Sequence, residues 1–371
     1  MAEELERAST PLYAQVKRIL YSMVETSELQ PGDRVLSENE LIARYHISST
    51  TARRVLNDMV QEGVLYRVQG KGTFVARVAG DNRVRRRVNV VMPHCETDEL
   101  DNFYFGSVIM GLHEGLAGLA AQVVLSWKDP DRRLSYLEVY RQDSSLGGMA
   151  IVAPRKDALV ELTELREMSA PFVVVGATFA GQGIPSVDTD NLQGAKDAVR
   201  HLAGLGHRRI ALVSAVLDEM NSIDRRRGYI EALEEAGLSV DPDLIFEQTQ
   251  SVKNLDFAAD AVDTLLTMAN PPTAVFAASH TLAMGVMLAL KARGVRIPDD
   301  VSLVGFDDLS SSLYVEPPLS TVSQPVFEMA KRAGKLLAEI MRDNWPATDN
   351  CEILLPTSLV VRESCGPRNR M

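Results

Sequence analysis

Short apolar runs alternate with stretches of helical periodicity throughout residues 88–366 of this 371-residue chain. The apolar runs include VNVVMP, QVVLS, MAIVAP, PFVVVG, PSVDTD, RIALVS, AVFAAS and VSLVGF. Between them lie helical segments such as GAKDAVRHLAGLGH, RRRGYIEALEEAG and HTLAMGVMLALKARG. Strands that alternate with helices predict an α/β fold with parallel sheets. Roughly nine strands are too many for one ordinary sheet, so the pattern favours two lobes.

The first 76 residues follow a different pattern, in which three helices come before a hairpin. A first helix is indicated by apolar residues at helical spacing: Leu12, Val16, Ile19, Leu20, Met23 and Val24. Ser37 and Glu40 have the spacing of a capping box, which predicts a short second helix ending near Tyr45. Ser48 can cap a third helix, whose buried stripe is Ala52, Val55, Leu56, Met59 and Val60.

The segment VLYRVQGKGTFVARV then reads as two short strands around a glycine-rich turn at residues 70–72. Three helices and a hairpin in this order describe a winged helix-turn-helix. We therefore expect three segments: an N-terminal winged helix-turn-helix at 1–76, a basic linker at 77–87, and a two-lobed α/β domain at 88–366.

Charge is distributed unevenly along the chain, whose formal net charge is -11. Residues 1–87 hold 14 Lys/Arg against 11 Asp/Glu, and residues 44–87 alone hold 10 against 3. Residues 88–371 hold 25 against 39. A basic segment on an acidic body indicates a nucleic-acid-binding end. Chance clustering beside a solvated basic tether is the alternative, and composition alone leaves it open.

Several classes of protein are disfavoured by the sequence. There is no uncharged apolar run of roughly 18 residues, so no membrane span is expected. The charged opening segment MAEELERASTPLYAQ does not have the pattern of a secretory signal. The three cysteines, Cys95, Cys351 and Cys365, are odd in number and far apart, which favours reduced thiols and a cytoplasmic location. They have no metal-ligand spacing with the histidines, so we expect no metal site and no cofactor.

The N-terminal segment resembles the GntR-type DNA-binding domain. The shared motifs are PGD (31–33), SE (37–38), ISSTT (47–51), EG (62–63) and GKGTFV (70–75). Two departures stand out: Ser49 occupies a position where the family usually has arginine, and Leu36 one where it has proline. The resemblance implies contact with double-stranded operator DNA through Arg34, Ser37, Ser48, Ser49, Thr50, Thr51, Arg53, Arg54, Gln69, Gly70 and Lys71.

The residue types suit that role. Hydroxyls and amides at a helix N-terminus can bind phosphate oxygens, and an arginine one turn later can reach guanine edges or the DNA backbone. Taken alone, Thr50, Thr51 and Arg53 also fit an ordinary exposed helix face. The glycines at 70 and 72 also fit a plain hairpin turn, and a phosphate-binding loop is excluded because its Gly-Lys-Ser/Thr ending is missing.

Residues 88–366 resemble the LacI/GalR-type effector domain, which shares its fold with periplasmic sugar-binding proteins. The matching stretches are VDTDN (187–191), HL (201–202), GHRRI (206–210), RRRGY (225–229), VGFDD (304–308) and PPLSTV (317–322). The resemblance implies a small-molecule effector, a sugar or sugar phosphate, held between the lobes. The residues it implies for this site are Phe103, Phe105, Arg225, Phe257, Ser279, His280, Asp307 and Gln324.

Some of these assignments have alternatives. The family usually has Asn-Asp where this chain has Ser279-His280, so His280 either contacts the effector or caps the following helix. His207 is better explained as a structural residue at the start of a strand than as a ligand contact.

A ligand-responsive transcription factor, most simply a homodimeric repressor of carbohydrate-use genes, accounts for both halves of the chain. A transport-type solute-binding protein would account for the second half alone. The basic N-terminal segment and the missing secretory signal argue against it. An enzyme is not indicated, because no G-x-G-x-x-G follows the first strand and no phosphate loop or nucleophile elbow occurs.

Overall fold

Two separately packed units make up the chain in the computed structural model, Met1–Val84 and Arg85–Met371. The structure describes residues 12–25, 28–30, 32–61, 64–68, 71–76, 87–93, 103–119, 121–127, 135–143, 146–248, 254–342 and 351–368. Residues 77–86 of the expected linker lie outside these ranges. None of the helices in the described ranges is long and apolar enough to cross a membrane.

The first unit has the three helices and the hairpin that the sequence predicts. Its elements are α1 (Leu12–Glu25), α2 (Glu38–Tyr45), α3 (Ser49–Gln61), β1 (Leu65–Val68) and β2 (Gly72–Val75). The capping box is present: the Glu40 amide donates to the Ser37 hydroxyl, and the Glu40 carboxylate accepts from the Ser37 amide. Ser48 caps α3, because its hydroxyl oxygen accepts from the Thr51 amide at 3.1 Å.

A single small core joins these elements. The fully buried stripe of α3 consists of Ala52, Val55, Leu56 and Met59, which pack against Val16 and Leu20 of α1. β1 and β2 pair in antiparallel register, with Leu65 opposite Val75. Arg34 bridges to Phe74 and adds a short third line of pairing to the hairpin. Together these contacts form a winged helix-turn-helix.

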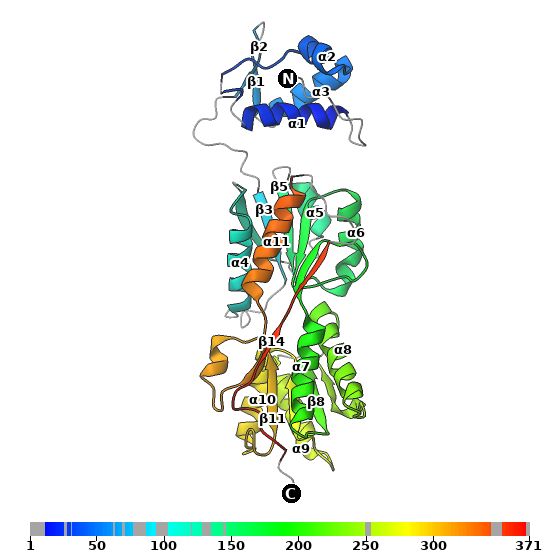
Figure 1. Ribbon diagram of the computed structural model, residues 1–371, viewed down its shortest axis with the longest axis vertical. Helices are drawn as coiled ribbons and strands as arrows, with labels where there is room; N and C mark the ends of the chain where they lie inside the picture. Colours follow the sequence, from blue (N-terminus) through cyan, green and yellow to red (C-terminus); the bar gives the residue numbers. More distant parts are fainter. Residues whose placement is uncertain are drawn as a thin grey trace. The chain divides into compact units, whose positions relative to one another are not determined.

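The second unit contains two six-stranded sheets, each covered on both faces by helices (Figure 1). The N-lobe sheet has the order β13-β7-β6-β5-β3-β4 and is parallel throughout. Its strands are β3 (Arg87–Met92), β4 (Gln122–Trp127), β5 (Leu146–Val152), β6 (Phe172–Val175), β7 (Ser186–Thr189) and β13 (Glu352–Leu355).

The C-lobe sheet has the order β14-β12-β11-β10-β8-β9, and only its edge pair β12–β14 is antiparallel. Its strands are β8 (Ile210–Ser214), β9 (Ile245–Glu247), β10 (Ala274–Ala277), β11 (Ser302–Phe306), β12 (Ser320–Ser323) and β14 (Ser358–Val360). The central strands of both sheets are buried on both faces, as their uninterrupted apolar sequences predict.

Eight α-helices of the described residues cover the two sheets. They are α4 (Phe103–Gly115), α5 (Tyr136–Gln142), α6 (Leu159–Glu167), α7 (Asn191–Gly204), α8 (Met220–Glu235), α9 (Asn254–Thr267), α10 (His280–Ala292) and α11 (Val326–Ile340). The first three belong to the N-lobe and the next four to the C-lobe. α11 follows the C-lobe strand β12, but it packs on the N-lobe sheet beside α4 (Figure 1).

The chain therefore passes between the lobes three times: from β7 to α7, from β12 to α11, and from β13 to β14. α4 and α11 pack very closely on the N-lobe. A Cβ added at Gly111 would lie 2.4 Å from the Phe327 carbonyl oxygen, and one at Gly115 would lie 2.3 Å from the Lys331 oxygen. Glycine at both positions permits this backbone contact, which makes the two helices one packed element.

Candidate functional site

The first turn of α3 presents hydroxyl groups to solvent. Ser48, Ser49 and Thr50 are exposed. The Ser48 hydroxyl already accepts the Thr51 amide and lies 2.8 Å from the Thr51 hydroxyl, so it maintains the helix start. Ser49 and Thr50 are therefore better placed than Ser48 to offer a hydroxyl to a phosphate group at this helix N-terminus.

The two arginines of α3 have different surroundings. Arg53 has a side chain that is 65% exposed and forms an ion pair with Glu38 of α2 at 3.3 Å. Glu38 is shared with Arg67 of β1, at 3.8 Å. The Arg54 guanidinium lies over the Tyr13 ring of α1, 4.7 Å from its centre, which restrains it. Arg53 is thus the arginine of α3 that a DNA phosphate could bind in place of Glu38.

The other expected DNA contacts are distributed around the same unit. Arg34 lies 3.6 Å from Glu40, and Ser37 is engaged in the capping box. Lys71 is exposed where β2 begins. Gln69 and Gly70, which were expected to contact DNA from the wing, lie outside the described residues.

A second group of polar residues lies between the two lobes, and Arg225 of α8 is its centre. The Arg225 side chain is only 7% exposed. Its Nε donates to Asn191 Oδ1 at 2.9 Å, and its Nη1 donates to the Ala278 carbonyl oxygen at 2.6 Å. Its Cζ lies 3.8 Å from the centre of the Phe306 ring. These contacts hold the guanidinium plane in one orientation and leave Nη2 directed toward Asp307.

Asp307 follows β11 and has a backbone φ of 72°, a left-handed conformation that an aspartate adopts more readily than most residues. Its Oδ1 lies 3.7 Å from Arg225 Nη2, which is longer than a hydrogen bond. The same oxygen accepts from the Gln324 amide, whose oxygen in turn accepts from the Thr189 hydroxyl. Because Thr189 ends the N-lobe strand β7, this chain of contacts links the two lobes.

Asp188 lies beside this chain and is almost completely buried. Its Oδ1 accepts from the Thr189 amide at 2.7 Å, and its Oδ2 accepts from Asn191 Nδ2 at 3.1 Å. Burial raises the pKa of Asp188 to about 7, although these hydrogen bonds and the Arg225 charge act in the opposite direction. Asp188 therefore titrates near neutrality while it orients Asn191, which holds Arg225.

A cavity of about 260 Å³ opens next to Asp307. Its N-lobe wall contains Tyr104 and Ser107 from the first turns of α4, and the start of α11 forms another side. Its lining residues are Tyr104, Ser107, Asp307, Asp308, Leu309, Gln324, Pro325, Val326, Phe327 and Glu328. Burial and the nearby carboxylates raise the pKa of Tyr104, so its hydroxyl stays neutral and can donate a hydrogen bond.

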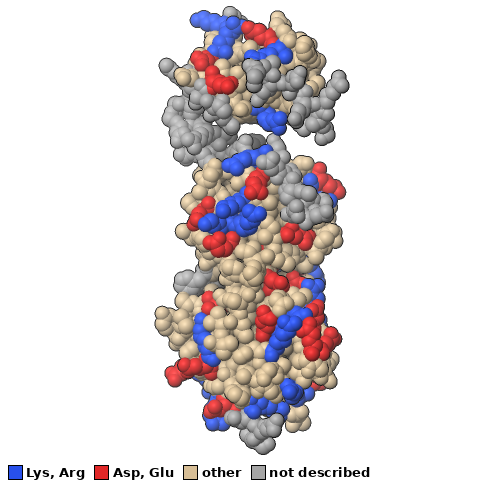
Figure 2. Space-filling model, in the orientation of Figure 1, with Lys and Arg blue, Asp and Glu red and all other residues tan. Residues whose placement is uncertain are grey.

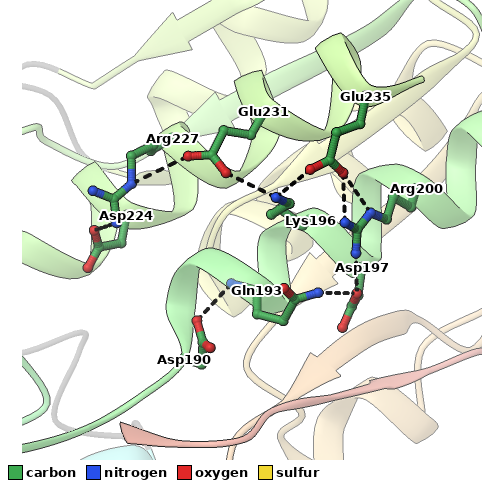
Figure 3. A network of polar contacts seen from close by, with 9 residues as sticks. All are labelled: Asp190, Gln193, Lys196, Asp197, Arg200, Asp224, Arg227, Glu231 and Glu235. Carbon is green, nitrogen blue, oxygen red and sulfur yellow. Dashed lines mark hydrogen bonds and ion pairs between the residues drawn. The ribbon is translucent and has the colours of Figure 1, made fainter. Parts of the chain in front are cut away.

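The helices that carry Asn191 and Arg225 are joined by a network of ion pairs (Figure 3). Lys196 of α7 bridges Glu231 at 3.0 Å and Glu235 at 2.6 Å, both on α8. Arg200 of α7 also contacts Glu235, at 2.7 Å. On the face shown in Figure 2, basic side chains of the lobes lie beside acidic ones in the same way. The network fixes α7 against α8 and so helps to place the Asn191–Arg225 hydrogen bond.

A further contact joins the lobes away from the three crossings. Arg155, which follows β5, forms an ion pair with Asp218 at 2.9 Å and a β-bridge with Glu219. The Lys156 amide donates to the Asp218 carbonyl oxygen at 2.8 Å. Both loops leave the carboxyl ends of their strands, so this contact joins the carboxyl-end edges of the two sheets.

Other residues expected at the effector site are engaged in local structure. The Ser279 hydroxyl caps α10 by accepting from the Leu282 amide. His280 is buried, with its ring nitrogens 2.8 Å from the Ser311 hydroxyl and 3.4 Å from the Ser312 hydroxyl. The alternative of a helix cap at this position is therefore realised by Ser279 rather than by His280.

The aromatic residues expected at the site are partly buried in cores. Phe105 packs against the N-lobe core and contacts the Tyr104 ring edge to face at 5.4 Å. Phe257 of α9 packs against the C-lobe core. The Phe103 side chain lies outside the described part of the structure. His207 is buried between Thr273 and the Gly366 carbonyl, in agreement with a structural role.

Sequence reasoning selected Arg225, Asp307 and Gln324, which the structure brings together, but it did not select Tyr104, Asp188, Thr189 or Asn191. A signal for the last three was present. They stand in the motif VDTDN, at the end of a strand and directly before a helix. In open α/β sheets that position faces the ligand crevice.

Comparison with known proteins finds matches for both units. Residues 12–75 match the bacterial regulatory proteins of the gntR family, and residues 199–365 match the periplasmic binding protein-like domain. The arabinose metabolism transcriptional repressor of Geobacillus stearothermophilus is 26% identical, and the match covers 97% of this chain and 99% of that protein.

The HTH-type transcriptional regulator CelR of Thermobifida fusca is 30% identical over 85% of this chain and 94% of its own length. Among solved structures, a complex of a transcriptional regulator CelR with cellobiose has a TM-score of 0.66 at 26% identity. That likeness covers 87% of this chain and 93% of the other. The similarity is therefore to whole regulators and not to one shared domain.

Proposed function

This chain belongs to the bacterial transcriptional regulators that join a DNA-binding head to a periplasmic-binding-protein-like domain, and from that membership we propose a specific mode of action. The protein is a homodimeric repressor of carbohydrate-use genes. A sugar-like effector binds between its two lobes and releases it from operator DNA. In this proposal the head comprises residues 1–76, the linker 77–87 and the effector domain 88–366.

The observation that carries the proposal is the pair Arg225 and Asp307 beside a cavity between the lobes. A sugar hydroxyl placed beside this pair can accept from Arg225 Nη2 and donate to Asp307 Oδ1, because the two atoms lie 3.7 Å apart, which is longer than a direct hydrogen bond. Tyr104 and Gln324 add further polar groups around the cavity. An arabinose repressor and a cellobiose-bound regulator among the relatives support a carbohydrate as the effector.

The dimer follows from the way such heads read DNA. Operators are commonly two-fold symmetric, and two heads related by a two-fold axis meet the two half-sites equally. A regulator of this kind acts in the cytoplasm, where its operator is. Coupling between effector and operator is reciprocal, so operator DNA must weaken effector binding by the same factor as the effector weakens DNA binding.

The DNA-binding part is tested by selecting duplexes from a random library with the purified protein. The expected result is enrichment of a two-fold symmetric sequence, whose affinity falls steeply with salt because phosphate contacts release counterions. Arg53→Ala should weaken binding to the selected duplex. Arg18→Ala removes the same charge from the exposed face of α1 and serves as the matched control.

The effector part is tested by a thermal-shift screen against sugars, since a ligand that binds only the folded state raises its melting temperature. A sugar that does so should also reduce affinity for the selected duplex. Failure to enrich any duplex would contradict the DNA-binding role. A stabilising sugar without effect on DNA binding would contradict the coupling.

A further inference from the structure

The charges around the inter-lobe cavity point to the class of effector. We propose that this site accepts an uncharged polyhydroxy ligand and rejects the phosphorylated or carboxylated form of the same sugar. This inference rests on the proposed function, because it concerns the effector of that same site. The sequence predicts either a free sugar or a sugar phosphate as the effector, and this inference favours the free sugar.

The floor of the site contains two carboxyl groups and one guanidinium. Arg225 lies near two carboxyl groups: that of Asp188, which is almost completely buried, and that of Asp307, whose side chain is 19% exposed. The guanidinium is also committed elsewhere: Nε donates to Asn191, Nη1 donates to the Ala278 oxygen, and one face lies on Phe306. An anion entering here would meet Asp307 before it could recruit a free cation.

The wall of the cavity continues this pattern. Among the described residues that line it, Asp307, Asp308 and Glu328 carry carboxylates and none carries a positive charge. Arg362 neutralises Asp308 by a two-pronged ion pair, with Nη1 and Nη2 at 2.8 and 2.9 Å from its two oxygens. Glu328 is exposed at the start of α11 and places a further negative charge there.

The N-terminus of α11 also borders the cavity, and helix N-termini attract anions. Here part of that attraction is already used. Pro325 at the N-cap has no N–H to offer, and the Val326 amide donates to the Gln324 carbonyl oxygen at 2.9 Å. The Glu328 carboxylate occupies the first turn, where the positive end of the helix dipole stabilises an anion.

A neutral hydroxyl group suits these surroundings. It can donate to Asp307 and accept from Arg225 or Tyr104, so each of its polar atoms finds a partner. A phosphate brings a charge of about -1.5 to -2, and its dianion, which predominates at pH 7, has only acceptor oxygens and gives Asp307 no donor. A carboxylate has the same defect with a smaller charge. The proposed discrimination therefore comes from hydrogen-bond chemistry as well as from charge.

The test compares neutral sugars with their anionic partners at constant ionic strength. The pairs are arabinose with arabinose 5-phosphate, glucose with glucose 6-phosphate, and galactose with galacturonate, each titrated into the full-length protein while melting temperature is followed. In every responding pair, the neutral member should act at a concentration at least about 10-fold lower. An anionic member that binds as tightly as its neutral partner overturns the proposal and leaves the sugar effector of the proposed function intact. A panel without any response overturns the sugar effector itself, and this inference with it.

Two variants locate the source of the discrimination. Glu328→Lys reverses the charge at the cavity and should reduce the difference between neutral and anionic partners by about 10-fold or more. Glu339→Lys makes the same change at an exposed position near the other end of α11 and should leave the difference unchanged. Equal behaviour of the two variants would contradict the assignment. Because both side chains are exposed, the melting temperature without ligand shows directly whether either variant is misfolded.

Discussion

Replacing Gly228 with alanine should separate α7 from α8 and disturb Arg225. A Cβ at Gly228 would lie 2.3 Å from the Leu192 carbonyl oxygen and 2.9 Å from Ala195 Cβ. Ordinary contact begins near 3.4 Å, so the helices must separate by roughly 1 Å. Leu192 is next to Asn191, and Gly228 is nearly one helical turn from Arg225. The 2.9 Å hydrogen bond between Arg225 and Asn191 would then stretch to about 4 Å, beyond bonding range.

The expected size of the effect has two parts. Overpacking of a tight helix contact costs about 1–3 kcal/mol, and loss of a hydrogen bond to a charged group costs about 1.5–3 kcal/mol. A total of roughly 2.5–6 kcal/mol corresponds to a drop in melting temperature on the order of 10 °C for a domain of this size. Effector affinity should fall as well, because the guanidinium is no longer held in place.

The assay is thermal unfolding followed by far-UV circular dichroism, together with effector titration. Gly204→Ala is the matched control: Gly204 lies in α7, and an added Cβ would meet nothing within 4 Å. Alanine is favoured over glycine in a helix, so this control should be neutral or slightly stabilising. If Gly228→Ala melted within 1–2 °C of wild type and kept its effector response, the close packing would not be what positions Arg225.

Three further predictions concern other contacts. Glu38→Gln removes the carboxylate that pairs with Arg53, so affinity for the selected duplex should rise several-fold at low salt. Fluorescence anisotropy measures this affinity. An unchanged affinity would argue against competition between Glu38 and DNA for Arg53. Arg155→Asp should lower effector affinity, measured by titration, because it breaks the ion pair between the lobes. The double variant Arg155→Asp/Asp218→Arg should recover that affinity. If the two substitutions instead reduced effector affinity additively, this pairing would be excluded. Because the folded-state pKa of Asp188 is raised to about 7, its contribution to stability is present in full below about pH 4 and is lost as pH rises toward 7. Asp188→Asn should therefore abolish a loss of up to about 4 kcal/mol in unfolding free energy that the wild type suffers as pH rises. Melting temperatures measured from pH 4.5 to 8 that follow the wild-type curve would refute this prediction.

The elements that could be predicted from the sequence are those with local signals. The capping box at Ser37 and the cap at Ser48 depend on residues three apart, and the buried central strands are continuous apolar runs. The strands β12, β13 and β14 lack such a signal, because STVS, EILL and SLV are short or polar. β13 is a strand because it pairs with β7, more than 160 residues earlier in the chain. No local sequence pattern predicts this pairing at the edge of the sheet.

The site could be predicted in part for the same reason. Arg225 and Asp307 stand in motifs with fixed spacing to a glycine or to a strand end. The aromatic wall depends instead on the phase of α4, where consecutive side chains are about 100° apart around the axis. The sequence pattern points to Phe105, whereas the neighbouring Tyr104 is the one that lines the cavity; both rings also pack against the N-lobe core.

The three passages between the lobes affect the order in which the protein can fold as it is synthesised. The head is continuous in sequence, with its core complete by Val75, so it can fold while most of the chain is still being made. The N-lobe cannot do the same. Its sheet needs β13, and its outer layer needs α11, both of which are translated after nearly the whole C-lobe. A nascent chain would thus acquire the means to bind DNA well before it acquires the means to be released from it.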